Sequence, residues 1–387
     1  MADATSDAFL QGQGIPVDLR EIEGTLQHLW GPAAERVGGP QPKQPNMTRI
    51  VLANLVVERL TPEAESLRPV VEEVITRYPC RAIVVRGSDN AERKITAEVS
   101  ALCHLPDSGM SQVCSERIVL HAGPNAVDLV SGAVRPLLES DLPMVLWWTT
   151  DPKSNEALFR NLGDECSRLV LDLPDPGTSA TSLALGLDPA ICPCSRDAVW
   201  FGLTRWRELV AQFFDPPCHH ETLERIDSFQ IEAYSPDPSA PPRLAIWLAA
   251  WLAGQLGWKR QGKPVNKSTT AGSSFRAAFL GPLGTVAVEI VTQPVPANLP
   301  PTPTLTAVTI AARGPAGVEM FIRRRPSPHS SDVRIAAKAP DYCQLLRTVR
   351  APELDAARRV VSALDASRVD RPFENARPIA LWLLEHI

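Results

Sequence analysis

The first half of the chain alternates short apolar runs with amphipathic segments, and this alternation restricts the fold more than any other feature. Runs typical of strands lie at 47–60, 81–87, 94–103, 116–123, 143–148 and 167–174. Segments typical of helices lie between or before them, at 18–30, 66–78, 124–140 and 152–162. Because strands alternate with helices, we expect an α/β domain with a mixed sheet.

The second half has a different pattern, which predicts a second domain. Residues 173–195 are rich in Pro, Ser, Thr and Gly, as in a connection. We therefore expect an α/β domain over 1–175, a linker over 176–195 and a C-terminal domain over 196–387. That domain combines helices with paired strands, including a hairpin that turns at 281–284, so we predict an α+β domain with an antiparallel sheet. The helix at 243–258 is apolar nearly all round and should be central to its core.

Charge and composition exclude several function classes. The net charge of −5 gives no basic field to recruit nucleic acid or an anionic membrane. The N-terminus does not resemble a secretory signal, and the longest apolar run, 244–253, is too short to span a bilayer. We therefore expect a cytoplasmic protein that binds neither membrane nor nucleic acid. In that compartment the eight cysteines should be thiols.

Sequence motifs of the common enzyme classes are absent. There is no P-loop, no Gly-x-Ser-x-Gly elbow, no His-Glu-x-x-His and no Cys-x-x-Cys. Gly12-Gln13-Gly14 begins like a dinucleotide fingerprint but lacks the preceding strand and the third glycine. We predict no cofactor, no catalytic residue and no enzyme activity.

The cysteines and histidines offer one weak metal candidate. Cys192, Cys194, Cys218, His219 and His220 are zinc-ligand types, but Cys-x-Cys is not the usual ligand spacing. We predict no metal site.

A lone thiol next to an arginine is also more typical of packing than of chemistry. Cys80 precedes Arg81 at the start of a predicted strand, and no histidine is nearby in sequence to act as its base. We expect a buried structural thiol.

Two adjacent tryptophans end the strand in DLPMVLWWTTDP. Successive strand residues point to opposite faces, so Trp147 and Trp148 cannot share one environment. Either both faces are covered and both residues are buried, or one Trp is exposed as an anchor for a protein partner. The same alternatives apply to Arg205 and Arg207 on the helix at 203–215, as solvated side chains or as interface arginines.

Several stretches together resemble one family. They are EIEGTLQHLW, TRIVLANLVV, TRYPCRAIVV, CSERIVL, DLPMVLWWTTDP, GDECSRLVLD, WFGLTRWRELVAQFFDPP and LAIWLAAWLAGQLGW. In this order they resemble the OpcA family of glucose-6-phosphate dehydrogenase assembly proteins, over about residues 20–290. The chain departs from the family at Tyr78, where the family usually has His, and at Ser115, where it has a second Cys.

The resemblance implies a non-catalytic assembly factor or allosteric effector in the oxidative pentose phosphate pathway. Its partner would be glucose-6-phosphate dehydrogenase, and we expect Trp147, Trp148, Arg81, Arg205 and Arg207 to contact it. The alternative is a metal- or sugar-phosphate-dependent enzyme, or a sugar-phosphate sensor. In that case Arg49, Arg81 and Arg205 could grip a phosphate bidentately.

Overall fold

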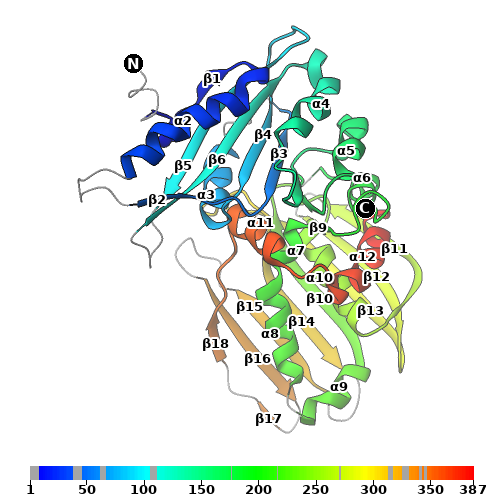
Figure 1. The fold of residues 1–387 in the computed structure, drawn as a ribbon. Coiled ribbons are helices and arrows are strands. Elements are labelled where there is room, and N and C mark those ends of the chain that lie inside the picture. The colour runs from blue at the N-terminus through cyan, green and yellow to red at the C-terminus, as the bar shows by residue number, and fades with distance from the viewer. Residues whose placement is uncertain are drawn as a thin grey trace. The chain divides into compact units, whose positions relative to one another are not determined.

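The computed structural model describes two compact units (Figure 1). The described residues are 8–37, 46–61, 67–104, 111–175, 177–215, 217–269, 272–312, 317–324, 331–339, 342–343 and 347–387. The first unit comprises 1–173, 185–197 and 356–365, and the second comprises 174–184, 198–355 and 366–387. The chain therefore passes between the units more than once. The stretch 176–195, expected to be a linker, contains α6 (Ala180–Gly186) and the first residue of β9.

The first unit is built on a mixed sheet, as predicted. Its strands are β1 (Ile15–Val17), β2 (Asn46–Arg49), β3 (Asn54–Arg59), β4 (Arg81–Gly87), β5 (Ile95–His104), β6 (Ser111–Ala122), β7 (Met144–Trp148), β8 (Arg168–Leu171) and β9 (Ser195–Asp197). The order is β1-β5-β6-β4-β3-β7-β8-β9, and β2 pairs with β6. From β6 to β9 all neighbours on this path are parallel, whereas β5 is antiparallel to β1 and β6.

The parallel strands follow the order of a dinucleotide-binding Rossmann fold. On the path from β6 to β9, β3 comes first in chain order, β4 and β6 lie on one side of it, and β7, β8 and β9 on the other; β2, which pairs in parallel with β6, lies off this path. This is the order 3-2-1-4-5-6, with β5 inserted as an antiparallel strand. Buried strands of this kind read as continuous apolar runs, and β3 and β7 are buried along almost their whole length.

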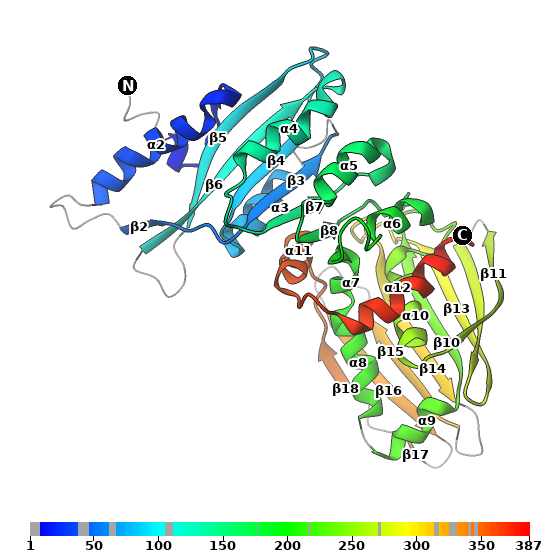
Figure 2. The same ribbon diagram turned by 45° about the vertical axis from the view of Figure 1, so that its right-hand side comes forward.

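Helices cover both faces of this sheet. They are α2 (Ile22–Val37), α3 (Arg68–Arg77), α4 (Val130–Val134), α5 (Glu156–Gly163) and α11 (Ala356–Asp365). Figures 1 and 2 show α4 and α5 on one face and α3 on the other. α11 packs against α3 and β8, although it comes near the end of the chain. The central strands therefore have no solvent-facing side.

The second unit places helices on one face of a large sheet. Its strands are β10 (Ile226–Ser235), β11 (Lys259–Thr269), β12 (Gly272–Gly281), β13 (Gly284–Pro294), β14 (Thr304–Ala312), β15 (Glu319–Arg324), β16 (Asp332–Ala339), β17 (Tyr342–Cys343) and β18 (Arg347–Arg350). The helices are α7 (Ala198–Gly202), α8 (Thr204–Phe214), α9 (His220–Glu224), α10 (Arg243–Gln255) and α12 (Arg371–Leu384). The predicted β12–β13 hairpin is present, with Gly281 opposite Gly284. The sheet is mixed and not purely antiparallel, because β10 pairs in parallel with β13.

An aromatic cluster forms the core of the second unit. The Trp200, Trp247 and Phe373 rings lie with centroids 5.0–5.7 Å apart. Trp200 also donates a hydrogen bond to Asp370 at 3.0 Å. α10, as predicted, is buried on nearly every side, and Trp251 is only 8% exposed. Among the described residues, no helix is both long and apolar enough to cross a membrane.

Candidate functional site

The carboxyl ends of β3 and β7 form the point where the strand order of the first sheet reverses. Ligands of open parallel sheets bind in the crevice outside the strand ends at such a switch point. Here β3 ends with Glu58 and Arg59, and β7 is followed by Thr149 and Thr150. These residues are the first candidates for a functional site.

The Glu58 carboxyl group occupies the switch point itself. Its side chain is fully buried and accepts hydrogen bonds from the Leu60 N–H and the Thr150 hydroxyl, both at 2.9 Å. The N–H groups of Thr149 and Thr150 lie 3.4 and 3.3 Å from Oε2. Burial raises the pKa of Glu58, and the hydrogen bonds oppose that shift only in part. The Leu60 N–H, at the start of the connection from β3 to α3, and the donors that follow β7 are thus engaged by the chain's own carboxyl group.

The connection from β3 to α3 also differs from a dinucleotide loop. Residues 60–67, LTPEAESL, contain no glycine. A Cβ atom at Gly87, at the end of β4, would lie 2.9 Å from the backbone of Leu60 and Thr61, so the connection begins directly against this strand. Gly12 and Gly14 precede the edge strand β1, which is antiparallel to β5, and they do not join a strand to a helix. Neither segment therefore has both the glycines and the strand-to-helix position of a nucleotide loop.

A positively charged pocket lies beside the switch point, between the start of α3 and the sheet. It encloses about 420 Å³, including its open mouth. We call it the arginine pocket, and its lining residues are Arg59, Leu67, Arg68, Val71, Val84, Arg86, Glu98, Arg117 and Val119. Four cationic side chains thus share the wall with one carboxylate.

Two of these arginines are fixed by Glu72 on α3. Arg117 is 4% exposed and contacts Glu72 at 2.6 Å, the Ser100 hydroxyl at 3.0 Å and the Gly12 carbonyl at 2.8 Å. Arg68 contacts the same Glu72 oxygen at 2.9 Å. Since Glu72 bridges a strand residue and a helix residue, these pairs hold the first turn of α3 against the sheet.

Arg59 differs from these two arginines. Among the described residues it has no ion-pair or hydrogen-bond partner, and its Nε is buried without an acceptor. Arg86 stands opposite Arg59 in the β3–β4 register. The sequence analysis did not single out Glu58, Arg59 or Arg86. The sequence signal that could have indicated the two arginines is that each lies at the end of an apolar run typical of a strand, and that these runs follow each other in the chain.

Arg81, predicted to contact a partner, lies in a buried ion-pair network. Its side chain is 4% exposed and contacts Glu116 at 2.8 Å, Glu139 at 2.9 Å and Glu23 at 2.6 Å. Arg49 contacts Glu116 and Glu139 as well, both at 2.8 Å. These arginines are therefore occupied by carboxylates of the chain, and the structure does not leave the Arg81 side chain accessible to a partner or a phosphate.

Both tryptophans of β7 are buried, so the alternative in which one of them is exposed as an anchor is wrong. The exposed fractions of Trp147 and Trp148 are 0%. Trp148 packs edge-on against Phe159 of α5, with ring centroids 5.0 Å apart. Trp147 must point to the opposite face, on which α3 lies. The alternative with two covered faces is confirmed, because helices cover both sides of this strand.

The two arginines of α8 have different environments. Arg207 stacks on the Trp200 ring at 3.8 Å, and burial lowers its pKa to about 10. Arg205 is 36% exposed and pairs with Glu208 at 3.1 Å. Of the five residues expected to contact a partner, Arg205 is the most accessible in the structure.

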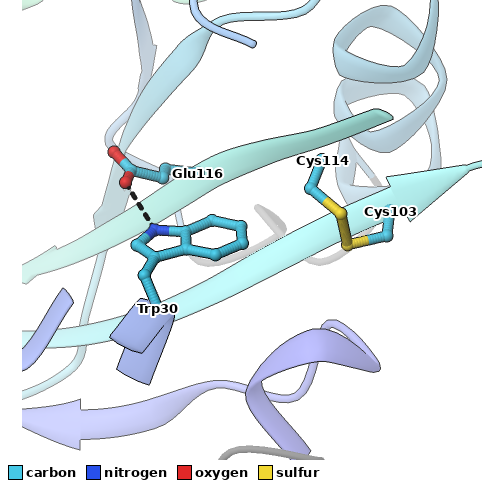
Figure 3. The surroundings of a disulfide bond; sticks show 4 residues. All are labelled: Trp30, Cys103, Cys114 and Glu116. Carbon is cyan, nitrogen blue, oxygen red and sulfur yellow. Dashed lines mark hydrogen bonds between the residues drawn. A yellow bond between two sulfur atoms is a disulfide. The ribbon is translucent and has the colours of Figure 1, made fainter. Parts of the chain in front are cut away.

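A disulfide corrects the expectation that all cysteines are thiols. Cys103 and Cys114 face each other across β5 and β6 and are bonded (Figure 3). Two residues further along β6, Glu116 accepts a 2.7 Å hydrogen bond from the Trp30 indole of α2. Cys80 is a buried thiol, as expected, and burial raises its pKa to about 12. Its backbone N–H donates to the hydroxyl of Ser115 at 3.3 Å.

The residues of the proposed metal candidate show structural roles where the structure describes them. His219 is buried, stacks on the Phe213 ring and lies 2.7 Å from the Phe213 carbonyl through Nδ1. Cys192 and Cys194 are buried in the first unit. Within the described part of the chain, no three His, Cys, Asp or Glu side chains converge as a metal site would require. That the protein needs no metal stays a prediction.

Comparison with solved structures adds no functional argument. The chain is similar to a Bacillus subtilis protein named as an oxidoreductase, YvaA, with 11% identity, 85% and 94% of the two chains covered and a TM-score of 0.46. The chain is also similar to the transcriptional regulator Gal80p from Kluyveromyces lactis, with 9% identity and a TM-score of 0.43. This match covers 81% of this chain and 79% of the Gal80p chain.

Sequence comparisons identify the family. A model described as "glucose-6-phosphate dehydrogenase subunit N-terminal domain" matches residues 71–184, and the corresponding C-terminal domain matches 193–377. The chain is 28% identical over 194 residues to a Nostoc punctiforme protein named as the OxPP cycle protein OpcA, covering 49% of this chain and 40% of the relative. A Synechocystis protein with the same name is 26% identical over 250 residues, which cover 60% of this chain and 51% of the relative. The chain thus spans about half the length of these relatives or less. The chain belongs to the OpcA family.

Proposed function

We propose that this protein is a non-catalytic partner of glucose-6-phosphate dehydrogenase that promotes the active oligomer of that enzyme. The observation that carries the proposal is the family match. Models of a glucose-6-phosphate dehydrogenase subunit cover both halves of the chain. Relatives named for the oxidative pentose phosphate cycle support the same pathway.

The switch point supports the non-catalytic part of the proposal. A dehydrogenase with this strand order would need room and donors for a pyrophosphate beside the first strand. Glu58 engages the Leu60 N–H at the start of the 60–67 connection, and this connection has no glycine to let a phosphate approach the backbone. An NADP-dependent oxidation would therefore depend on the partner enzyme's own site.

Arg205 supplies a test of where the partner binds. Among the described residues it has one ion pair, the exposed i,i+3 pair with Glu208, and its Nε donates a long hydrogen bond of 3.4 Å to the Arg350 carbonyl, so replacing it by alanine should cost the fold little. If the partner covers α8, Arg205→Ala should weaken binding by about 1–2 kcal/mol, as for an interface arginine. Arg225→Ala is the matched control, because Arg225 is also exposed and paired within its helix, with Glu221.

The experiment is a titration of the dehydrogenase with the purified protein, followed by sedimentation velocity. We expect a complex containing both chains and a shift of the dehydrogenase toward a larger species. A dehydrogenase that sediments unchanged at saturating concentrations of the protein would overturn the proposal. If the complex forms and Arg205→Ala binds like the parent, the proposal stands and the contact lies elsewhere.

A further inference from the structure

We propose that two copies of this protein associate through the second unit, along the face of its sheet that lies opposite the helices. We call this the open face. It comprises the outward side chains of β10, β12, β13, β14, β15 and β16. The inference concerns the protein alone, so it holds or fails independently of the proposed action on the dehydrogenase.

Alternation along the strands creates the open face. Successive side chains of a strand point to opposite faces of the sheet. On one face the side chains are buried beneath α8 and α10, which contact β15 and β10, β13 and β14 respectively (Figures 1 and 2). On the other face Gln230, Thr309 and Phe321 stand next to one another across β10, β14 and β15. All three are partly exposed, so this face is available for contact.

The centre of the open face is uncharged. Beside the row of Gln230, Thr309 and Phe321 lie Ser228 and Ala311, which also pair in register. The core of a protein interface is depleted of charged residues and enriched in aromatic ones. An uncharged centre with an aromatic side chain therefore favours contact with another protein surface.

Two arginines without ion pairs lie on one side of this centre. Arg323 of β15 and Arg334 of β16 stand directly opposite each other in register and are both exposed. Among the described residues neither has an ion-pair partner. Like charges that face each other across two strands destabilise a sheet. A carboxylate from outside the chain would remove this repulsion.

The other side of the centre offers such a carboxylate. Glu232 of β10 is partly exposed and has no ion pair within the described part of the chain. The remaining charges of the open face are balanced locally. Glu289 pairs with Arg276 at 2.9 Å, and Glu319 stands opposite Lys338 in register. What remains is one carboxylate on β10 and two guanidinium groups on β15 and β16.

The register makes these charges complementary between two copies. Glu232 and Arg323 are both paired with Ala307, so they lie at one level on either side of β14. A twofold axis along β14 places β10 of one copy over β15 of the other. Glu232 of each copy then meets Arg323 and Arg334 of the second copy, as an isologous interface requires. Thr309, on β14, lies near the axis and meets its own counterpart.

The open face is large enough for a stable dimer. It spans six neighbouring strands, and β10 and β13 pair over eight residues. With strands about 4.8 Å apart and a rise of about 3.3 Å per residue, the face measures about 29 by 26 Å. This is close to the area of about 800 Å² that each partner buries in a specific interface. Because α8 lies on the opposite face, a dimer also leaves Arg205 accessible to the dehydrogenase.

Sedimentation velocity of the purified protein alone, from about 1 to 100 μM, tests the proposal. We expect a reversible dimer whose fraction rises with concentration and falls at high salt, since charged pairs contribute to it. A protein that stays monomeric at the highest concentration would overturn the proposal.

Charge reversal tests the pairing. Glu232→Arg should raise the dissociation constant of the dimer about tenfold or more, because it places an arginine opposite two others. Adding Arg323→Glu to this variant should recover most of the loss, which a misfolded protein could not do. The matched control is Glu224→Arg, with the same change of charge at an exposed position of α9, which packs on α8. It should dimerise like the parent. A double variant that recovers nothing would refute the twofold arrangement.

Thr309→Glu tests the axis. It brings two carboxylates together at the centre of the interface, so it should also weaken the dimer about tenfold or more while keeping the parent's melting curve. A dimer that neither Thr309→Glu nor Glu232→Arg weakens would show that the copies meet elsewhere and would overturn the proposal. A monomeric parent whose Thr309→Glu variant loses binding to the dehydrogenase would assign the open face to that enzyme, and would likewise overturn the dimer.

Discussion

Replacing Trp148 by alanine should lower the free energy of unfolding of the first unit by about 3–5 kcal/mol. The side chain is fully buried in the central strand β7, so its removal leaves a cavity. Its edge-on contact with Phe159, at 5.0 Å between centroids, adds about 0.5–1.5 kcal/mol to the loss. The value should therefore lie toward the upper end of the range.

Trp148→Phe is the matched control. The indole Nε1 is buried and has no hydrogen-bond partner among the described residues, so phenylalanine keeps an aromatic ring and loses no such bond. We expect it to cost less than half as much as alanine. A cost similar to that of Trp148→Ala would mean that the indole N–H has a partner.

The assay is thermal unfolding followed by circular dichroism or calorimetry, with the two units analysed as separate transitions. For a unit of about two hundred residues, 3–5 kcal/mol corresponds to a shift of about 6–20 °C. A Trp148→Ala protein that melts within 2 °C of the parent would refute the burial of this side chain. It would also restore the exposed-anchor interpretation.

Three further results are expected. Because burial raises the pKa of Glu58 above 4.5, its contribution to stability is present at low pH and is lost as the pH rises through the folded value. In urea unfolding from pH 4 to 7, the free energy of unfolding of the parent should thus fall relative to that of Glu58→Gln as the pH rises. The same pH dependence in both proteins would contradict this. Trp251→Ala should destabilise the second unit by about 3–5 kcal/mol in the same urea assay, and a change below about 1 kcal/mol would show that α10 is peripheral. Alkylation of the denatured protein, followed by mass spectrometry, should add two fewer alkyl groups without reductant than with it, because Cys103 and Cys114 are bonded. Equal numbers of alkyl groups in the two samples would show that both cysteines are thiols.

The pattern of the first half predicted its architecture well, because strand and helix periodicities are local properties. The opposite orientations of Trp147 and Trp148 also followed from local geometry. Whether the second face of β7 is covered could not be predicted in this way. α11 at 356–365 returns to pack on α3 and β8, and no local pattern indicates such a return.

The sites depended even more on long-range contacts. Arg81 could be identified as a strand-end arginine, but its three glutamate partners come from distant segments of the chain. Likewise, Arg59 and Arg86 face one pocket only because β3 and β4 pair in register. The parallel pairing of β10 with β13 was missed because α10 and two strands separate them in sequence.

The central claim is that the protein acts through glucose-6-phosphate dehydrogenase and has no turnover of its own. The direct measurement is NADPH formation from glucose 6-phosphate by the protein alone, by the dehydrogenase alone and by both together. We expect no rate above background for the protein alone, and a rate for the mixture that differs from that of the dehydrogenase and saturates with added protein. NADPH formation by the protein alone, or a mixture that matches the dehydrogenase at every concentration, would contradict the account.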